Sequence, residues 1–296
     1  MNVTFRQLRV FLALADSGSV SAAARITHVT QPTASMQLRD LTRSVGLPLY
    51  EVIARRVHLT EAGHELARIG RQMISQWSAF EQYVDGVRGY TRGRLSVAVV
   101  STAKYFVPRL LGAFCELHPE VEISLEVLNR DGVLERLNDN RDDLYVMSLP
   151  PDDPNVEREP FLSNPLVVIA PTRHRLAARS TVALADLVDE KFILRERGSG
   201  TRLAADAHFK KRRFRPNLRL ELGSNEAIRE AVAGGLGVAV LSRRALPTSL
   251  SDHGLIELPV EGFPLQAEWY VVYPKSKRLS PVANIFRQHV IEAAQR

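Results

Sequence analysis

The sequence predicts a multidomain α+β protein, in which a small helical module and a long helix precede a larger α/β region. Three patterns predict this division. Apolar residues recur at three- and four-residue spacings near the N-terminus, a heptad spacing runs through residues 66–87, and short apolar strands alternate with helices after residue 94. The chain has 296 residues, which is enough for two or three units of ordinary size.

The composition favours packed cores and a solvated surface. Apolar residues make up 45% of the chain and charged residues 24%. No apolar run approaches the roughly 18 residues of a membrane span, and the N-terminus lacks the layout of a signal peptide. Cys115 is the only cysteine, which excludes an intrachain disulfide and a metal site of paired cysteines. We therefore expect a cytoplasmic protein without a membrane partner or a metal site.

Positive charge is concentrated at the N-terminal end. The chain carries a net charge of +6, and residues 1–58 contain seven arginines against three acidic residues, with no lysine before Lys104. A compact basic module at one end favours a nucleic-acid partner. On charge alone, however, a solvated basic surface without any partner explains the pattern equally well.

The first 59 residues predict three helices and a short β-ribbon. The predicted helices cover residues 4–15, 20–26 and about 31–45, and the ribbon covers 53–59. Ser19 or Ser21 can cap the second helix, and Thr30 is a good cap for the third. Pro32 then falls in the first helical turn, where its missing N–H costs nothing. The module is therefore a tri-helical unit with a ribbon beside it.

The third helix of such a unit suits the major groove of DNA, which is wide enough to admit one helix. Gln and Arg side chains can pair with base edges, Thr and Met can contact thymine methyls, and hydroxyls can bind phosphates. The candidate DNA-binding residues are Ser21, Thr30, Gln31, Pro32, Thr33, Ser35, Met36 and Arg39, with Arg55 and Arg56 on the ribbon. Periodicity alone also fits a small helical bundle that never binds DNA.

A long helix is predicted over residues 60–90, with Thr60 as its cap. Its apolar residues follow a heptad seam at Leu66, Gly70, Met73, Trp77, Phe80, Val84 and Val87. A seam this regular favours pairing with the same helix of a second copy. Packing against the helix's own chain is the alternative.

The remaining residues alternate between short apolar strands and helices, which predicts α/β units with mostly parallel sheets. Their number suits two lobes. We place the first lobe at about 91–161 and 267–296, and the second at about 162–266. The proline-rich segment 150–154 and the segment 261–264 are the predicted crossings between the lobes.

Several runs of residues resemble the LysR-type transcriptional regulators. They are Phe5–Phe11, Gly18–Ala24, Thr30–Ser35, Leu47–Glu51 and Arg55–Gly63, and they follow the order and spacing of that family over about 60 residues. The resemblance implies a winged helix-turn-helix DNA-binding domain at 1–59, a linker helix for dimerisation at 60–90, and a periplasmic-binding-protein-like effector domain at 91–296. Val52 and Met36 depart from the family pattern, because polar residues are common at both places.

Three further runs are similar to one branch, the CbbR/CmpR-like regulators of Calvin-cycle and inorganic-carbon operons. They are Val100–Leu110, Asn164–Pro171 and Arg195–Arg202. This resemblance implies an effector that is a phosphorylated or carboxylated metabolite of carbon fixation. Pairing of the long helices would hold two winged domains at a fixed separation, so that the dimer reads an inverted-repeat DNA operator. The LysR family implies that this dimer assembles further into a tetramer, and RNA polymerase is a candidate partner.

Two predicted turns can form an anion site between the lobes. Each follows a strand and opens a helix, so that hydroxyls and free backbone N–H groups meet at a helix N-terminus. The candidate effector-binding residues are Ser101, Thr102, Lys104, Asn129, Ser199, Gly200, Thr201, Arg202 and Asn225. Taken one by one, each Ser or Thr serves equally well as an ordinary helix cap.

Two other functions compete with a DNA-binding regulator. A solute-binding protein of a transport system fits the α/β half, but it does not account for residues 1–89 or for the lack of a signal peptide. An enzyme would need a nucleophile, a base and an orienting group, and no such set emerges from the sequence. We therefore predict a regulator without catalytic residues, without a covalently bound cofactor, and controlled by a small anionic metabolite.

Overall fold

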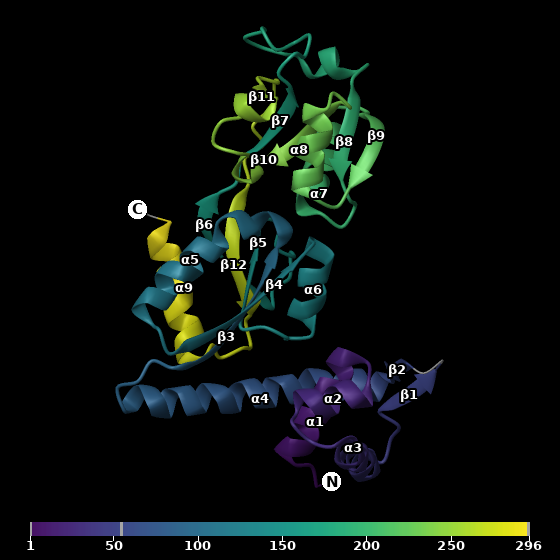
Figure 1. The fold of residues 1–296 in the computed structure, drawn as a ribbon, viewed down its shortest axis with the longest axis vertical. Helices are drawn as coiled ribbons and strands as arrows, with labels where there is room; N and C mark the ends of the chain where they lie inside the picture. The colour runs from purple at the N-terminus through teal and green to yellow at the C-terminus, as the bar shows by residue number, and fades with distance from the viewer. Residues whose placement is uncertain (1, 54–55, 295–296) are drawn as a thin grey trace. The chain divides into compact units, whose positions relative to one another are not determined.

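The computed structural model describes residues 2–53 and 56–294, and its elements are drawn in Figure 1. The described residues form two compact units: one contains the chain up to Tyr90 with the short segments 138–141 and 277–281, and the other contains the remainder. No helix in the described ranges combines the length and the apolar character that a membrane span requires.

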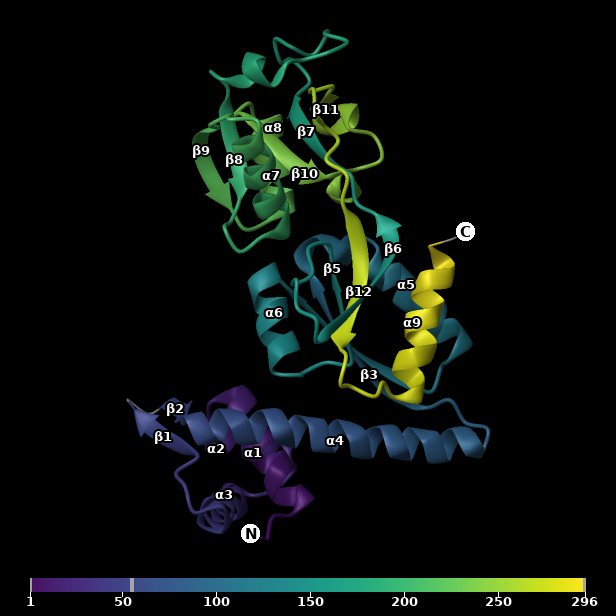
Figure 2. The same cartoon turned by 180° about the vertical axis from the view of Figure 1, so that it is seen from behind.

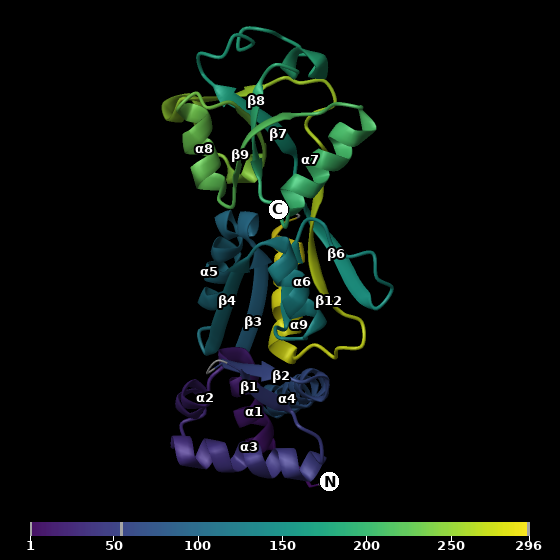
Figure 3. The same cartoon turned by 90° about the vertical axis from the view of Figure 1, so that its right-hand side faces the viewer.

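The first unit begins with three helices around one core. They are α1 (Phe5–Ser17), α2 (Val20–Ile26) and α3 (Gln31–Val45). Thr4 and Gln7 form a capping box at the start of α1, while Ser19 and Thr30 cap α2 and α3. Figure 3 shows α3 lengthwise, next to α1 and α2, and residues of all three helices share one apolar core. The predicted tri-helical unit is confirmed.

The ribbon and the long helix complete the first unit. Strands β1 (Tyr50–Ile53) and β2 (Arg56–Leu59) pair antiparallel, and α4 (Glu61–Val87) follows with Thr60 as its cap. A Cβ atom at Gly63 would lie 1.9 Å from the Leu49 carbonyl oxygen. Only glycine therefore lets the start of α4 approach the chain that enters the ribbon this closely.

The second unit contains two lobes, each with one five-stranded sheet. The first lobe comprises β3 (Gly93–Val100), a 3-10 turn (Ser101–Tyr105), α5 (Val107–Leu117), β4 (Val121–Leu128), α6 (Arg130–Asn138), β5 (Leu144–Met147), β6 (Val156–Ser163), β12 (Glu268–Pro274) and α9 (Pro281–Ala293). Its strand order is β4-β3-β5-β12-β6. Helices α5 and α9 lie side by side, where the rings of Phe114 and Phe286 are 5.1 Å apart (Figure 2).

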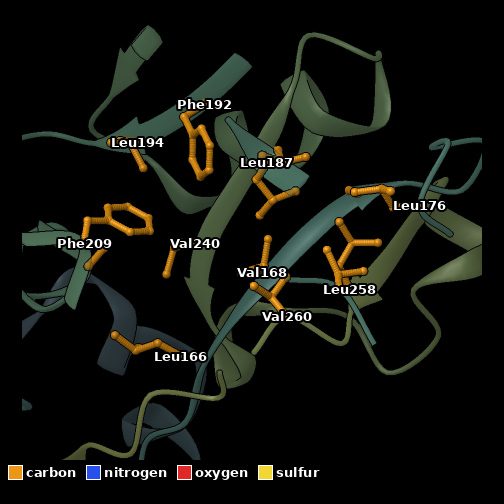
Figure 4. Close-up of a cluster of buried hydrophobic side chains, with 14 residues drawn as sticks. Leu166, Val168, Leu176, Leu187, Phe192, Leu194, Phe209, Val240, Leu258 and Val260 are labelled. Carbon is orange, nitrogen blue, oxygen red and sulfur yellow. The ribbon is translucent and has the colours of Figure 1, made fainter. Parts of the chain in front are cut away.

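The second lobe has the strand order β11-β7-β10-β8-β9. Its elements are β7 (Leu166–Pro171), β8 (Lys191–Arg195), α7 (Gly200–Lys211), β9 (Asn217–Leu222), α8 (Asn225–Ala233), β10 (Val238–Ser242) and β11 (Leu255–Leu258), with 3-10 turns at 184–187, 243–245 and 251–253. Alternate residues of β7 serve two cores. Leu166 and Val168 join the core that includes Phe209 of α7 (Figure 4), whereas Val167 and Ile169 pack with α8.

Two expectations about these lobes are wrong. Each sheet is mixed rather than mostly parallel, because β6 and β12 in the first lobe and β7 and β11 in the second run antiparallel to their neighbours. The segment 150–154 is also not a crossing, since β6 follows it and still belongs to the first sheet. Strand β6 has three consecutive charged residues, Glu157, Arg158 and Glu159, and no regular alternation, so only its pairing with β12 at the edge of the sheet identifies it.

The chain crosses between the lobes at Ser163–Leu166 and returns at Leu265–Glu268. These two crossings run side by side, since the Asn164 N–H donates to the Ala267 carbonyl at 2.8 Å and the Leu166 N–H donates to Leu265 at 3.0 Å. The return therefore begins next to the predicted segment 261–264. A paired two-strand hinge of this kind lets the lobes move about one line while each sheet stays intact.

Candidate functional site

Helix α3 divides into a buried face and an exposed face. Ala34, Leu38 and Leu41 are buried in the core of the first unit. The exposed stripe consists of Pro32, Met36, Arg39 and Arg43, at successive spacings of four, three and four residues. Met36 is 54% exposed, although an apolar side chain would gain free energy by burial. This face is therefore a surface to which a partner can bind.

The other DNA-binding candidates cluster around the start of α3. Gln31 is exposed, while Thr33 and Ser35 are partly buried. The Thr30 hydroxyl accepts the Thr33 N–H at 3.4 Å and lies 2.8 Å from the Thr33 hydroxyl, so both hydroxyls belong to the helix cap. A capping hydroxyl keeps a further lone pair free for another donor.

Three candidates lie outside α3. Ser21 is exposed near the start of α2, and Arg56 is exposed at the start of β2. Arg55 lies outside the described residues. The ribbon also exposes Val52 and Ile53, so its surface is apolar as well as basic.

The exposed face of α4 carries most of the predicted heptad seam. Trp77 is 44% exposed and Phe80 is 54% exposed, and Met73 and Val87 are exposed as well. The Trp77 ring packs between the rings of Phe5 and Phe80, at centroid distances of 5.6 and 5.8 Å. Gly70 instead lies against Leu12 of α1. The seam therefore has one part that packs on α1 and a longer apolar part that is uncovered.

A narrow cleft lies between the two lobes of the second unit. Its lining residues follow the strands β3, β5 and β8 or begin α6 and α7: Val100, Ser101, Thr102, Arg130, Met147, Ser148, Leu149, Arg195, Ser199, Gly200 and Thr201. The cavity volume is about 10 Å³, roughly the room that one water molecule needs. Five of the nine predicted effector-binding residues, Ser101, Thr102, Ser199, Gly200 and Thr201, line this cleft.

Arg195 joins the two lobes across this cleft. Its side chain is only 1% exposed. Its guanidinium donates to both Glu196 carboxylate oxygens at 2.8 Å, to the Asn225 amide oxygen at 2.9 Å, and to the Ser101 hydroxyl at 3.0 Å. The Asn225 amide in turn donates to the Thr102 hydroxyl at 3.2 Å. Ser101 and Thr102 belong to the first lobe, so these bonds hold the cleft closed.

A second contact between the lobes involves Lys104, Tyr105 and Glu226. The Lys104 ammonium lies 3.0 Å from the Glu226 carboxylate, and the Tyr105 hydroxyl donates to it at 2.7 Å. Burial would raise the pKa of Glu226, but hydrogen bonds from Tyr105, Ser224 and Lys104 outweigh it and lower this pKa to about 2. Burial and the Glu226 carboxylate together raise the pKa of Tyr105.

Lys104, Asn129, Arg202 and Asn225 do not line the cleft. Lys104 pairs with Glu226, as described above. The Asn129 side chain accepts the Gly132 N–H at 2.9 Å and so caps α6. Arg202 donates to Asp206 and Glu221 and to the Arg195 carbonyl, at 2.7–2.8 Å. These four side chains, which the sequence offered as cationic or amide groups for an effector, already form hydrogen bonds or ion pairs within the protein.

Two cations of the cleft were missed by sequence reasoning. Arg195 ends the buried strand β8, and Arg130 begins α6, where its guanidinium donates to the Leu149 carbonyl at 2.8 Å. A charged residue at the carboxyl end of an apolar strand was the available signal, since such ends face ligands in α/β sheets. Arg43, missed on α3, continues the spacing of Met36 and Arg39.

Family models match both units of the chain. The model described as "Bacterial regulatory helix-turn-helix protein, lysR family" matches residues 5–64, and the "LysR substrate binding domain" model matches residues 88–295. The chain belongs to the LysR family. It is thus a DNA-binding regulator with a small-molecule effector domain, and nothing supports the alternative of a transport protein.

Individual relatives agree with this family. The transcriptional activator CmpR of Synechocystis is 44% identical over 98% of this chain and 95% of its own. A RuBisCO operon transcriptional regulator of Acidithiobacillus ferrooxidans is 42% identical over 99% of this chain and 95% of its own. Both relatives are named as regulators of transcription, in agreement with the family.

Two solved structures are similar to the LysR-family chain. The regulatory domain of Synechocystis CcmR in complex with 2-PG has a TM-score of 0.67 at 44% identity, and the match covers 69% of this chain and 99% of that one. Full-length CbnR with its target DNA has a TM-score of 0.66 at 24% identity, and covers 99% of this chain and all of that one. The second likeness shows the fold.

Proposed function

We propose that this LysR-family regulator controls carbon-fixation operons and that a small phosphorylated or carboxylated metabolite binds between its lobes. The relatives named above support the gene class. The CcmR regulatory domain in complex with 2-PG supports the ligand class. We keep the division into a DNA-binding domain (1–59), a linker helix (60–90) and an effector domain (91–296), with lobes at 91–161 with 267–296 and at 162–266.

The observation that carries the ligand proposal is the chemistry at the start of α7. Arg195 and Arg130 line the same cleft as Ser199 and Thr201, which lie at the N-terminus of α7. The Ser199 hydroxyl makes no capping bond with its own helix. A helix N-terminus attracts negative charge, and guanidinium groups bind carboxylate and phosphate oxygens in pairs. A small anion fits this set of donors.

The ligand acts by changing how the lobes are held together. The Ser101 hydroxyl already accepts the Arg195 guanidinium, and the free space between the lobes holds about one water molecule. An anion that enters the cleft replaces some of these bonds between the lobes. It therefore binds more tightly to an arrangement of the lobes that differs from this one. The ligand shifts the equilibrium by the difference between its affinities for the two arrangements.

The DNA is contacted by α3 and the ribbon, with α4 joining two copies. The candidate residues remain Ser21, Thr30, Gln31, Pro32, Thr33, Ser35, Met36, Arg39, Arg55 and Arg56. A pair of modules held by α4 reads an inverted repeat, because a two-fold axis presents α3 twice. We further propose a tetramer in the cytoplasm that contacts RNA polymerase, as regulators at promoters do.

The ligand proposal is tested by calorimetry with 2-phosphoglycolate, the compound abbreviated 2-PG. We expect binding to the full-length protein and a stabilisation of about 2.7 kcal/mol at a ligand concentration of about 100 times Kd. Thr201→Val should abolish binding, because it removes a hydroxyl that lines the cleft. The matched control Thr181→Val changes an exposed threonine and should bind normally. Equal affinities of both variants would remove Thr201 from the site.

A further inference from the structure

A dense group of cations lies on the surface of the second lobe, away from the residues that line the cleft. We name the 210–219 patch for its members, Lys210, Lys211, Arg212, Arg213, Arg215 and Arg219. All six are exposed. They come from the last turn of α7, the loop that follows and the start of β9.

These cations are not neutralised by neighbouring carboxylates. Within the described residues, no side chain from Lys210 to Arg215 forms an ion pair, and the Arg219 guanidinium has only a 3.5 Å bond to the Leu236 carbonyl. Elsewhere in the same lobe, Arg175, Arg202 and Arg243 each pair with a carboxylate at 2.8 Å or less. The patch is therefore distinguished by the density of its unpaired cations in the described chain, six within ten residues.

Helix stability explains only part of this group. Lys210 and Lys211 lie in the last turn of α7, where a cation interacts favourably with the helix dipole. Arg213 lies beyond the helix with a φ of 54°, in the left-handed region that non-glycine residues rarely adopt. Arg215 and Arg219 follow in the loop and the strand. The left-handed conformation of Arg213 helps to end α7, but a role in ending the helix does not account for Arg215 and Arg219.

Phe214 turns inward, whereas the charged residues on either side of it are exposed. The Phe214 ring packs in the lobe core, 5.3 Å from the Phe209 ring and 5.7 Å from the Phe192 ring. Its neighbours Arg213 and Arg215 are exposed. The positive potential also acts on His208, whose pKa is lowered first by burial and then by Arg212 and Lys211.

We infer that the 210–219 patch is a second DNA-binding surface, which contacts the phosphate backbone without reading sequence. Duplex DNA carries one negative charge per about 1.7 Å of its axis, so it can face several cations at once. A protein partner would call for an apolar centre within the patch, whereas the six cations outnumber Leu218, the exposed apolar residue of this segment, and Phe214 packs partly buried against the lobe core. DNA is also tethered to this regulator already, which raises its effective concentration.

The direct test is photo-crosslinking of the full-length protein to a labelled random-sequence duplex of about 80 base pairs, several helical turns long. A benzophenone amino acid replaces Arg213 in one variant and Arg173, an exposed cation of the same lobe, in the control. We expect a DNA adduct from position 213 alone. A crosslink from position 213 to a second protein copy, or the same DNA yield from both positions, would overturn the inference.

Salt dependence gives an independent readout. Three neutralisations, Lys211→Gln, Arg213→Gln and Arg215→Gln, remove three cations of the patch. On the long duplex they should reduce the slope of log K against log salt by about 2.7, which is about 0.9 for each phosphate that the protein no longer neutralises. On a duplex of about 20 base pairs, the length of two helical turns that two copies of α3 occupy, we expect no change.

The control for this experiment neutralises Arg109, Arg173 and Arg278, three exposed cations outside the patch, and removes the same net charge. It should leave both slopes unchanged. Equal slopes for the patch variant and the control on the long duplex would refute the inference. Binding of α3 to DNA would survive that result, because it is measured on the short duplex.

Discussion

The face of α3 and the cleft between the lobes, the two proposed binding surfaces, differ in whether their side chains already have partners within the protein. Gln31, Met36 and Arg39 are exposed, and none is tied to a neighbour in the described chain except through its own helix backbone. In the cleft, the Arg195 guanidinium and the Ser101 hydroxyl already bind each other. A ligand in the cleft must therefore compete with existing bonds, whereas DNA would form bonds with exposed side chains of α3 that are not already engaged.

This difference separates recognition from response. A surface with free side chains can bind without rearranging, so its contacts determine affinity and sequence preference. In the cleft, the side chains that would bind an effector are already bonded to each other. The effector can therefore bind only when the protein changes these internal bonds, and such a change is what a sensor needs. The uncovered part of α4 is of the first kind, since Phe80 and Trp77 are exposed. The predictions below test this contrast, from the largest expected effect to the smallest.

Arg195→Met should have the largest effect. It removes a buried cation and leaves Glu196 and Asn225 without their partner, a loss of about 3–5 kcal/mol in the free energy of unfolding. Urea unfolding of the full-length protein and calorimetry with 2-phosphoglycolate measure the two consequences. Arg197→Met, two residues further on and exposed, is the matched control. A stable Arg195→Met variant that still binds the ligand would show that the cleft does not depend on shared bonds.

Phe80→Glu tests the proposal that α4 joins two copies, and it should separate them. Its ring packs on Trp77 and is otherwise largely exposed, so the change leaves the core of the first unit intact. Removal of an aromatic anchor from an interface costs about 2 kcal/mol or more. Analytical ultracentrifugation should show smaller species. Gln76→Glu adds the same charge at an exposed position outside the seam and should assemble normally. Unchanged sedimentation of Phe80→Glu would exclude the exposed seam as the contact.

Gln31→Ala should weaken binding to the operator by about 1–3 kcal/mol and leave binding to random DNA nearly unchanged, as expected when a hydrogen bond to a base edge is removed. The operator is first obtained by selection from a pool of random duplexes, and affinities are then measured by fluorescence anisotropy at one fixed salt concentration. Gln76→Ala on α4 serves as the control. If Gln31→Ala lowers both affinities equally, Gln31 contacts the backbone only.

Glu226 should give the smallest effect, a pH dependence of stability. The pKa of Glu226 is about 2 in the folded chain against an ordinary value of 4.5. Its contribution to the free energy of unfolding is therefore complete above pH 4.5 and is lost as the pH falls toward 2. Because its side chain is 41% exposed, solvent screening keeps this contribution small. Thermal unfolding at several pH values should show a shallower dependence for Glu226→Gln in that window. Identical profiles would mean that this contact does not stabilise the closed lobes.

Local patterns were sufficient wherever an element's own residues determine it. The caps Thr30 and Thr60, the third helix at about 31–45 and the long helix α4 were all predicted and confirmed, because caps and helical spacing act within a few residues. Strands β6 and β11 were missed and the sheets were expected to be more parallel. Strand direction depends on partners far along the chain, such as β12 for β6.

The cleft shows the same limit at the level of single side chains. Sequence reasoning placed Ser101, Thr102, Ser199, Gly200 and Thr201 at turns after strands, and these residues do line the cleft. It also chose Arg202 rather than Arg195 as the cation of the site, because the sequence alone does not distinguish two arginines near the same turn. Their roles differ only because Glu221 and Asp206 engage Arg202, while Asn225 and Ser101 lie against Arg195.

By itself, the sequence determined the helical module with its exposed third helix, the apolar seam of α4 and the two turns that can bind an anion. Each of these depends on residues within one or two turns of chain, where spacing fixes geometry. Only the tertiary structure decided which cations face the cleft, how the sheets are ordered, and that the cations of residues 210–219 have no carboxylate partner among the described residues. Ion pairing and strand pairing join residues that are distant in sequence, so folding has to bring them together before their chemistry is defined.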